Sequence, residues 1–253
     1  MFDEKKGVEK VNIQRSWIVF ILLFVFLVAG CTGTGGEGDI DQAEEKKIKE
    51  KAIQYIKDTY NKEFEVSEVN KGHAAGLIRV RGFVKDGKDT EATVFWKKEE
   101  EMDDTYLTEL WTKELTPRIK DMLNKHMSVR SVDHVSYNDG TAKDTRYTGN
   151  IPSIFDVLKN GGNEKYILEV TGEIYENGGQ TPENIKSFLK ELRDMNFHEI
   201  GFEFHVYDDR LNADLAKDEN KYLLYRYNIH IPNIQKVNIE NLDLDQYKTV
   251  IQH

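Results

Sequence analysis

The sequence predicts an α+β protein in which helices pack on antiparallel sheets and the chain forms two small domains. Two kinds of segment predict this class: some carry apolar residues at helical spacing, and others alternate apolar and polar residues as half-buried strands do. A polar, turn-rich stretch at 138–150 divides the chain into halves that both show this pattern. The 39% hydrophobic content, with 12 Tyr and 12 Phe, is sufficient for packed cores.

The N-terminal α+β domain is expected over 41–137 and begins with a helix. Asp39 or Asp41 can cap this helix, which we expect to end near Tyr60. Its apolar residues recur at spacings of three and four: Ile48, Ala52, Tyr55, Ile56 and Tyr60. One face of the helix is therefore expected to pack on a sheet.

Three antiparallel strands should follow this helix. They are expected at about 64–69, 76–85 and 91–97. Asp86-Gly87 is a strong hairpin signal between the second and third strands, because a tight turn favours this pair. The first domain is thus predicted to be a helix packed on a three-stranded meander.

The rest of the first half is predicted to be helical and then extended. Five carboxylates between Glu99 and Asp104 precede a helical pattern, and we attribute them to the favourable charge at a helix N-terminus rather than to cation binding. Thr116-Pro117 is expected to end that helix and to start another that runs through Met127. An edge strand is expected at 128–137.

The C-terminal α+β domain is expected over 151–253, after a linker at 138–150. Ser153 should cap a short helix, and Thr181-Pro182 should start a longer amphipathic helix. Alternating residues predict strands at about 166–174, 200–206 and 222–231. The tail from residue 233 is only weakly patterned.

The segment YIKDTYNKEFEV, Tyr55 to Val66, precedes the two hairpin strands. It resembles the cystatin-like and related α+β folds that occur among uncharacterised Gram-positive lipoproteins. The resemblance covers about a quarter of the chain and implies a helix on a curved antiparallel sheet, but it transfers no functional residues.

The first 30 residues have the pattern of an export signal. Four basic residues precede an apolar run of 14 residues, Trp17 to Gly30, which is shorter than the ~20 residues of a membrane-spanning helix. The run ends in Val28, Ala29, Gly30 and Cys31, which resembles the bacterial lipobox. This resemblance implies that diacylglycerol is attached to the sulfur of Cys31 and that residues 1–30 are removed. The alternative is an uncleaved, tilted anchor helix with an incidental cysteine.

Residues 31–40 follow as a glycine-rich tether. Cys31 is the only cysteine, so the chain can form neither an internal disulfide nor a cysteine-based metal cluster. We therefore expect the folded part to be held by a lipid on the extracytoplasmic face of the cell membrane. In its low proline content and its abundance of lysine and asparagine, the chain also resembles Gram-positive lipoproteins.

The formal net charge of −10 predicts repulsion from nucleic acid phosphates and anionic lipid headgroups, so nucleic acid is not an expected partner. The glycines of the tether neither follow a strand nor precede the Lys-Ser/Thr pair of a phosphate-binding loop. We expect no cofactor.

Candidate catalytic or metal-ligating residues are sparse. None of the seven histidines has the spacing of a zinc protease. Glu203 and His205 face away from the phenylalanines of their strand, and His230 lies on the corresponding face of the strand at 222–231. If the two strands pair, these three residues share an open sheet face. We interpret them as solvated residues and expect neither a metal site nor a catalytic site there.

These observations favour a non-enzymatic lipoprotein that binds another envelope protein, as a subunit of an envelope assembly or as an immunity- or inhibitor-type factor. One alternative is a lipoprotein that captures a solute or another ligand, although the sequence lacks the alternating strand–helix pattern of two parallel-sheet lobes. A hydrolase is the other alternative, with His205 and His230 as its candidate residues.

Overall fold

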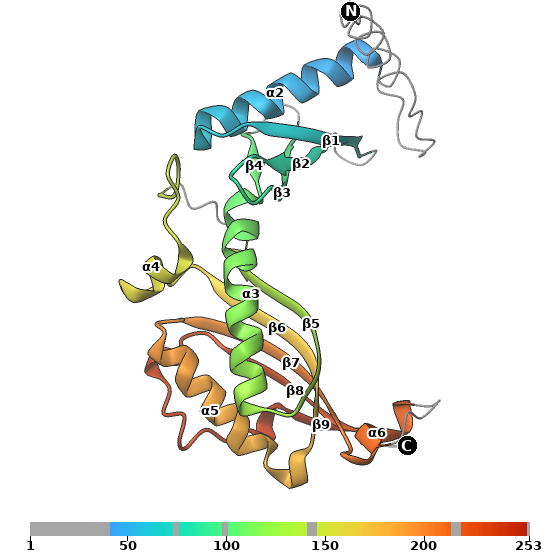
Figure 1. Ribbon diagram of the computed structural model, residues 1–253, viewed down its shortest axis with the longest axis vertical. Coiled ribbons are helices and arrows are strands. Elements are labelled where there is room, and N and C mark those ends of the chain that lie inside the picture. The colour runs from blue at the N-terminus through green and yellow to red at the C-terminus, as the bar shows by residue number, and fades with distance from the viewer. Residues whose placement is uncertain (1–40, 73–75, 98–100, 141–145, 214–218, 252–253) are drawn as a thin grey trace, which may run out of the picture. The chain divides into compact units, whose positions relative to one another are not determined.

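The computed structural model describes residues 41–72, 76–97, 101–140, 146–213 and 219–251 (Figure 1). It confirms the α+β fold class, because helices pack on two sheets, of four and five strands, and each sheet has its own core. The predicted export signal, the lipobox-like residues with Cys31 and the predicted tether lie outside the described residues. Within those residues, no helix is both long enough and apolar enough to span a bilayer.

The four-stranded sheet consists of consecutive strands that pair antiparallel in the order β1-β2-β3-β4. They are β1 (Phe64–Lys71), β2 (Ile78–Val84), β3 (Thr90–Trp96) and β4 (Asp103–Asp104). The predicted meander is confirmed, and Gly87 and Asp89 take positive φ angles of 88° and 49° in its β2–β3 turn. β4 was not expected: its two aspartates, which the sequence places at the start of a helix, also pair with Val94 and Phe95 of the sheet.

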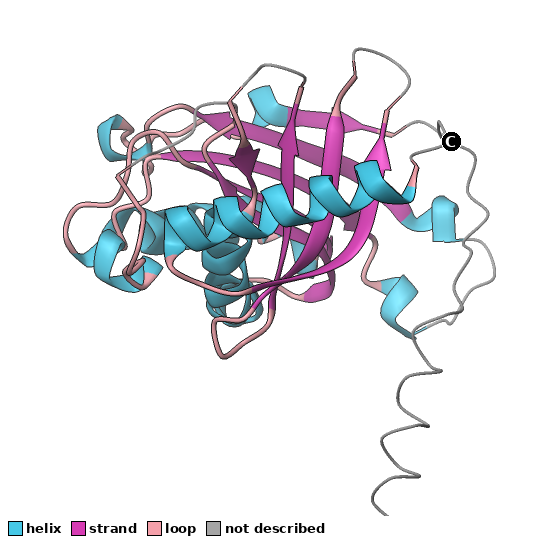
Figure 2. Cartoon of the chain, turned by 90° about the horizontal axis from the view of Figure 1, so that it is seen from above, coloured by secondary structure: helices cyan, strands magenta, loops and turns pink. Residues whose placement is uncertain are grey.

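The helix α2 (Gln42–Tyr60) lies across one face of this sheet (Figures 1 and 2). Asp41 caps it as predicted, because its carboxylate accepts a hydrogen bond of 2.8 Å from the Glu44 amide. The buried residues of the helix pack in the core of the sheet: Ile48, Ala52, Ile56 and Tyr60. Along β2, even-numbered side chains such as Val80 are buried in this core, and odd-numbered ones such as Arg79 are exposed.

The next helix, α3 (Tyr106–His126), is continuous, so the predicted break at Thr116-Pro117 is wrong. Proline removes one backbone hydrogen bond and costs about 3 kcal/mol in a helix interior. The apolar stripe continues beyond it, however, and both Ile119 and Met122 are fully buried. Each such side chain contributes about 1.5–3 kcal/mol on burial, which outweighs the cost of the proline.

Both cores include residues of α3. Tyr106, in its first turn, packs in the core of the four-stranded sheet, and Trp111 packs in the core of the other sheet. The indole Nε1 of Trp111 donates a hydrogen bond of 3.0 Å to the carbonyl oxygen of Pro152. Near the β2–β3 turn, Lys88 Nζ lies 3.2 Å from a carboxylate oxygen of Glu114 on α3. This helix therefore connects the two sheets.

The five-stranded sheet has the order β5-β6-β7-β8-β9. Its strands are β5 (Val129–Asn138), β6 (Ile167–Tyr175), β7 (Glu199–Tyr207), β8 (Leu223–Ile231) and β9 (Lys248–Val250). Neighbouring strands are antiparallel except β6 and β7, which are parallel. The helix α5 (Thr181–Asp194) connects this pair, because a chain that returns to the same end of a sheet needs a long crossover.

The position of β5 corrects the predicted domain boundary. β5 pairs with β6, so the segment at 129–138 belongs to the five-stranded sheet and not to the N-terminal domain at 41–137. The stretch at 138–150 therefore connects two strands of one sheet. The predicted edge position is confirmed, and two register shifts in β5 account for its irregular alternation.

One face of the five-stranded sheet is covered by α3 and α5 (Figure 1). Ser153 caps α4 (Ile154–Lys159) as predicted, by accepting a hydrogen bond from the Phe155 amide. A short helix, α6 (Arg210–Ala213), follows β7. The weakly patterned tail is nevertheless held in the core by three buried residues: Ile234, Ile239 and Leu244.

Candidate functional site

The other face of the five-stranded sheet carries the residues that the sequence singled out. Glu203 and His205 of β7 and His230 of β8 all lie on it, as predicted, because the alternate residues of both strands are buried on the helix side. The strands pair antiparallel, with His230 opposite Gly201 and His205 opposite Arg226.

His205 and His230 are nevertheless too far apart to act on one group. The four residue steps along β7 from Gly201, which lies opposite His230, to His205 separate the two histidines by about 13 Å at ~3.3 Å per residue. Each imidazole has its own carboxylate: His230 Nε2 lies 2.8 Å from Glu199 Oε1, and His205 Nε2 lies 3.4 Å from Glu203 Oε1. Across the described ranges, no three His, Cys, Asp or Glu residues are placed to hold a metal ion. The face thus carries two separate carboxylate–imidazole pairs.

A hollow of about 410 Å³ lies on this face, over β5 to β8. Gly201 contributes to its floor and has no side chain to fill it. Two carboxylates and two imidazoles surround it, those of Glu169, Glu203, His134 and His230. The hollow extends the predicted set of residues, and its groups can form hydrogen bonds with the surface of a partner.

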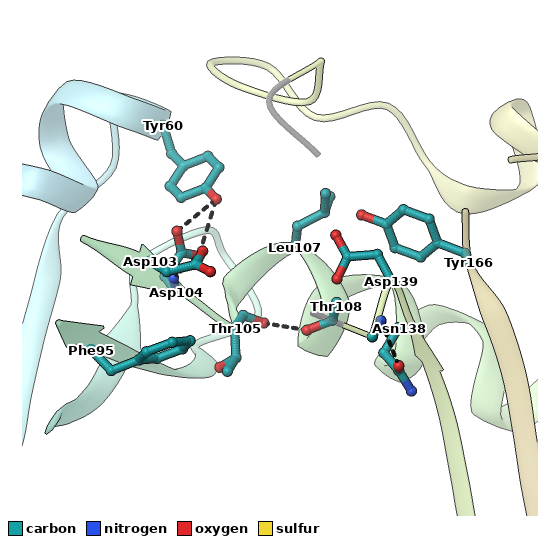
Figure 3. Close-up of a pocket in the computed structure, with 11 residues that line it drawn as sticks. Tyr60, Phe95, Asp103, Asp104, Thr105, Leu107, Thr108, Asn138, Asp139 and Tyr166 are labelled. Atoms are coloured by element: carbon teal, nitrogen blue, oxygen red, sulfur yellow. Dashed lines mark hydrogen bonds between the residues drawn. The ribbon is translucent and has the colours of Figure 1, made fainter. Parts of the chain in front are cut away.

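A second cavity, of about 370 Å³, lies where the four-stranded sheet, the start of α3 and the end of β5 meet (Figure 3). Residues from distant parts of the chain line it: Tyr60, Phe95, Asp103, Asp104, Thr105, Leu107, Thr108, Asn138, Asp139, Gly140 and Tyr166. Aspartates and aromatic rings are prominent in this lining, and none of its residues within the described ranges is a lysine or an arginine. Its size is within the range of small-molecule sites, and carboxylates beside aromatic faces favour an organic cation.

Asp104 is held firmly at the edge of this cavity (Figure 3). The hydroxyl of Tyr60 donates to it at 3.0 Å, as Figure 3 shows. The hydroxyl of Tyr55 donates to it at 2.7 Å and the backbone amide of Tyr106 at 2.8 Å. Burial raises the pKa of the Tyr55 and Tyr60 phenols well above the ordinary 10.0, and the negative charge of the Asp104 carboxylate is the second cause of this increase. Both phenols therefore stay protonated and keep donating, which connects α2 to the start of α3.

Sequence reasoning missed this cavity. It attributed Asp103 and Asp104 to a helix N-terminus, and the contact of Asp104 with the Tyr106 amide in the first turn of α3 agrees with that role. The tyrosines that meet Asp104 lie 49 and 44 residues earlier in the chain, and Asp139 comes from the stretch expected to be a linker. No local pattern connects these segments.

The sequence matches no protein-family model and no curated protein. Among solved structures, a DUF5037 family protein from Ruminococcus gnavus is similar at 15% sequence identity and a TM-score of 0.38. The similarity covers 76% of this chain and 96% of that protein.

Proposed function

We propose that the protein is a lipoprotein, anchored through Cys31 on the extracytoplasmic face of the cell membrane, whose folded part binds another envelope protein without catalysing a reaction. It acts in this proposal as a subunit of an envelope assembly or as an immunity- or inhibitor-type factor. The lipobox-like residues Val28 to Cys31 and the glycine-rich tether behind them support the anchor.

The observation that carries the binding role is the exposed face of the four-stranded sheet. Arg79, Arg81 and Phe83 of β2 are exposed on it, and Phe83 is 38% exposed although it is large and apolar. A groove of about 640 Å³ on the same sheet is lined by Arg79, Leu77 and Phe95 among others. Aromatic residues and arginine are enriched at protein–protein interfaces, and a rigid sheet presents them in a fixed arrangement.

The hydrolase alternative has no support from its two candidate residues, since His205 and His230 lie about 13 Å apart along the sheet. A nucleophile, a base and the group that orients the base must lie within hydrogen-bond reach of one another.

Chemical crosslinking of the lipidated protein in native membranes, followed by purification under denaturing conditions, tests the proposal. We expect one envelope protein to be recovered in a stoichiometric ratio. Cys31→Ala serves as the control, because it retains the folded part but removes the anchor. Recovery of no partner under any growth condition would contradict the binding role.

A second candidate function, capture of a small cationic solute, is favoured by the cavity at Asp104. A panel of amines and quaternary ammonium compounds should then raise the Tm of the protein, because a ligand of the folded state stabilises it by mass action. Asp139→Asn should reduce the shift, whereas Asp58→Asn on the exposed side of α2 should not. If no compound shifts the Tm, this candidate is excluded.

A further inference from the structure

The sequence contains two Asn-Gly pairs, and both lie in exposed turns. They are Asn160-Gly161, at the end of α4, and Asn177-Gly178, after β6. An asparagine that precedes glycine is prone to deamidation, because glycine has no side chain to keep its nitrogen away from the side-chain carbonyl carbon of the asparagine. The two pairs are therefore the candidate sites for this modification.

Deamidation of such a pair consumes one water molecule and releases one molecule of ammonia. The backbone nitrogen of the glycine loses its proton and forms a bond to the side-chain carbonyl carbon of the asparagine. The bond from that carbon to the side-chain nitrogen breaks, and ammonia leaves with the proton. Water then opens the resulting succinimide ring at either carbonyl group, which gives aspartate or isoaspartate. The reaction thus needs a glycine nitrogen that can lose its proton and reach the side chain.

The structure restrains both reacting groups of the Asn160-Gly161 pair. The side-chain amide of Asn160 donates a hydrogen bond of 2.8 Å to the backbone carbonyl oxygen of Asp156. The backbone amide of Gly161 donates one of 3.0 Å to the carbonyl oxygen of Leu158. Both acceptors are backbone groups of α4, so the helix itself holds this pair.

The Asn177-Gly178 pair is restrained by one side chain, that of Asp209. Its carboxylate accepts a hydrogen bond of 2.8 Å from the backbone amide of Asn177 and one of 2.9 Å from that of Gly178. The two residues have positive φ angles of 53° and 61°, and successive amides in such a turn form a concave site for an anion. Within the described part of the chain, the side-chain amide of Asn177 has no hydrogen-bond partner.

We propose that Asn177 is the principal deamidation site of the folded protein and that Asp209 slows its conversion. An amide that donates to a carboxylate keeps its proton, because the adjacent negative charge disfavours a nitrogen anion. The two hydrogen bonds also fix the peptide plane that must rotate before the Gly178 nitrogen reaches the side chain. The proposal goes beyond the proposed function and depends on neither the anchor nor a partner.

Peptide mapping by mass spectrometry tests the proposal on the full chain, incubated at mildly alkaline pH and sampled over time. Trypsin separates the two pairs, because Lys165 lies between them. We expect aspartate and isoaspartate to accumulate faster at Asn177 than at Asn160, since only Asn177 has an unrestrained side-chain amide. Deamidation that is equally fast or faster at Asn160 overturns the assignment of the site.

Asp209→Ala tests the role of the carboxylate. Loss of the hydrogen bond to the Gly178 amide should raise the rate at Asn177 about fivefold, which corresponds to the ~1 kcal/mol of one net hydrogen bond. Asp209→Asn keeps an acceptor oxygen but no charge and should give a smaller increase. Asp194→Ala is the matched control, because this exposed aspartate at the end of α5 pairs with Arg193. It should leave both rates unchanged.

The rate at Asn160 distinguishes release of one turn from loss of the fold, because unfolding frees both pairs. An increase in Asp209→Ala that is confined to Asn177 supports the proposal. An unchanged rate at Asn177, or an equal increase at both asparagines, overturns the protective role of Asp209.

Discussion

Replacing Asp104 with alanine should destabilise the protein more than any other single change at the cavity. The carboxylate accepts hydrogen bonds from the hydroxyls of Tyr55 and Tyr60 and from the Tyr106 amide. Tyr60 is 4% exposed and Tyr106 is 1% exposed, so water does not replace the lost acceptor at either residue. A buried donor left without a partner costs about 1–3 kcal/mol, and we therefore expect Asp104→Ala to lower the free energy of unfolding by ~2–4 kcal/mol.

Urea denaturation at neutral pH, followed by tryptophan fluorescence, measures this loss. Asp58→Ala is the matched control, because Asp58 on α2 accepts a single hydrogen bond from Gln54 at an exposed position. That contact is worth about 0.2–0.5 kcal/mol. If Asp104→Ala costs no more than Asp58→Ala, the network around Asp104 does not hold the sheet to α2 and α3.

The same network predicts a dependence on alkaline pH. The folded protein raises the pKa of Tyr55 and Tyr60, so it binds their protons more tightly than the unfolded chain does. Their contribution to stability is therefore complete below about pH 10 and is lost as the pH rises above that value. This alkaline loss should be smaller in Asp104→Ala, since the carboxylate is part of what raises both pKa values.

Three further predictions concern the packing of the sheets. Hydrogen bonds from Lys125 and His126 lower the pKa of Glu191. Glu191→Gln should therefore cost ~1–2 kcal/mol at pH 7 in urea denaturation, and the difference from wild type should shrink as the pH falls below the ordinary pKa of the carboxyl group, since the wild type then loses this contribution. Gly82→Ala would bring a Cβ within 2.3 Å of a backbone oxygen and should lower the free energy of unfolding by ~1–3 kcal/mol. Gly201→Ala should be tolerated, because the nearest atom to its Cβ would lie 3.7 Å away. Equal Tm values for the two variants would contradict this prediction. Trp111→Phe removes the hydrogen bond to the Pro152 carbonyl and some buried volume, and it should lower the Tm by about 4 °C. A Tm within about 1–2 °C of wild type would show that this contact is dispensable.

The parts of the fold that sequence predicted well depend on local signals. The Asp86-Gly87 turn and the alternation on either side of it determine the β2–β3 hairpin, and Ser153 determines the start of α4. A period of two residues also placed Glu203 and His205 correctly on one face of β7. Each of these predictions needs only a few consecutive residues.

The predictions that failed depend on contacts between distant segments. The break at Pro117 was wrong because burial of residues on both sides of it outweighs the proline, and burial is not visible in the local pattern. β5 was placed in the wrong half because its partner, β6, begins after a long polar stretch. The cavity was missed for the same reason, since Tyr60 and Asp104 meet only after the sheet and α2 have packed.

The most direct test of the central claim is mass spectrometry of the N-terminal peptide of the protein purified from its own membranes. The proposed anchor predicts a mature chain that begins at Cys31, with diacylglycerol attached to the sulfur, and predicts that Cys31→Ala abolishes both the lipid and the cleavage. A membrane-bound protein whose peptide still contains Val28 to Cys31 with a free thiol would contradict it.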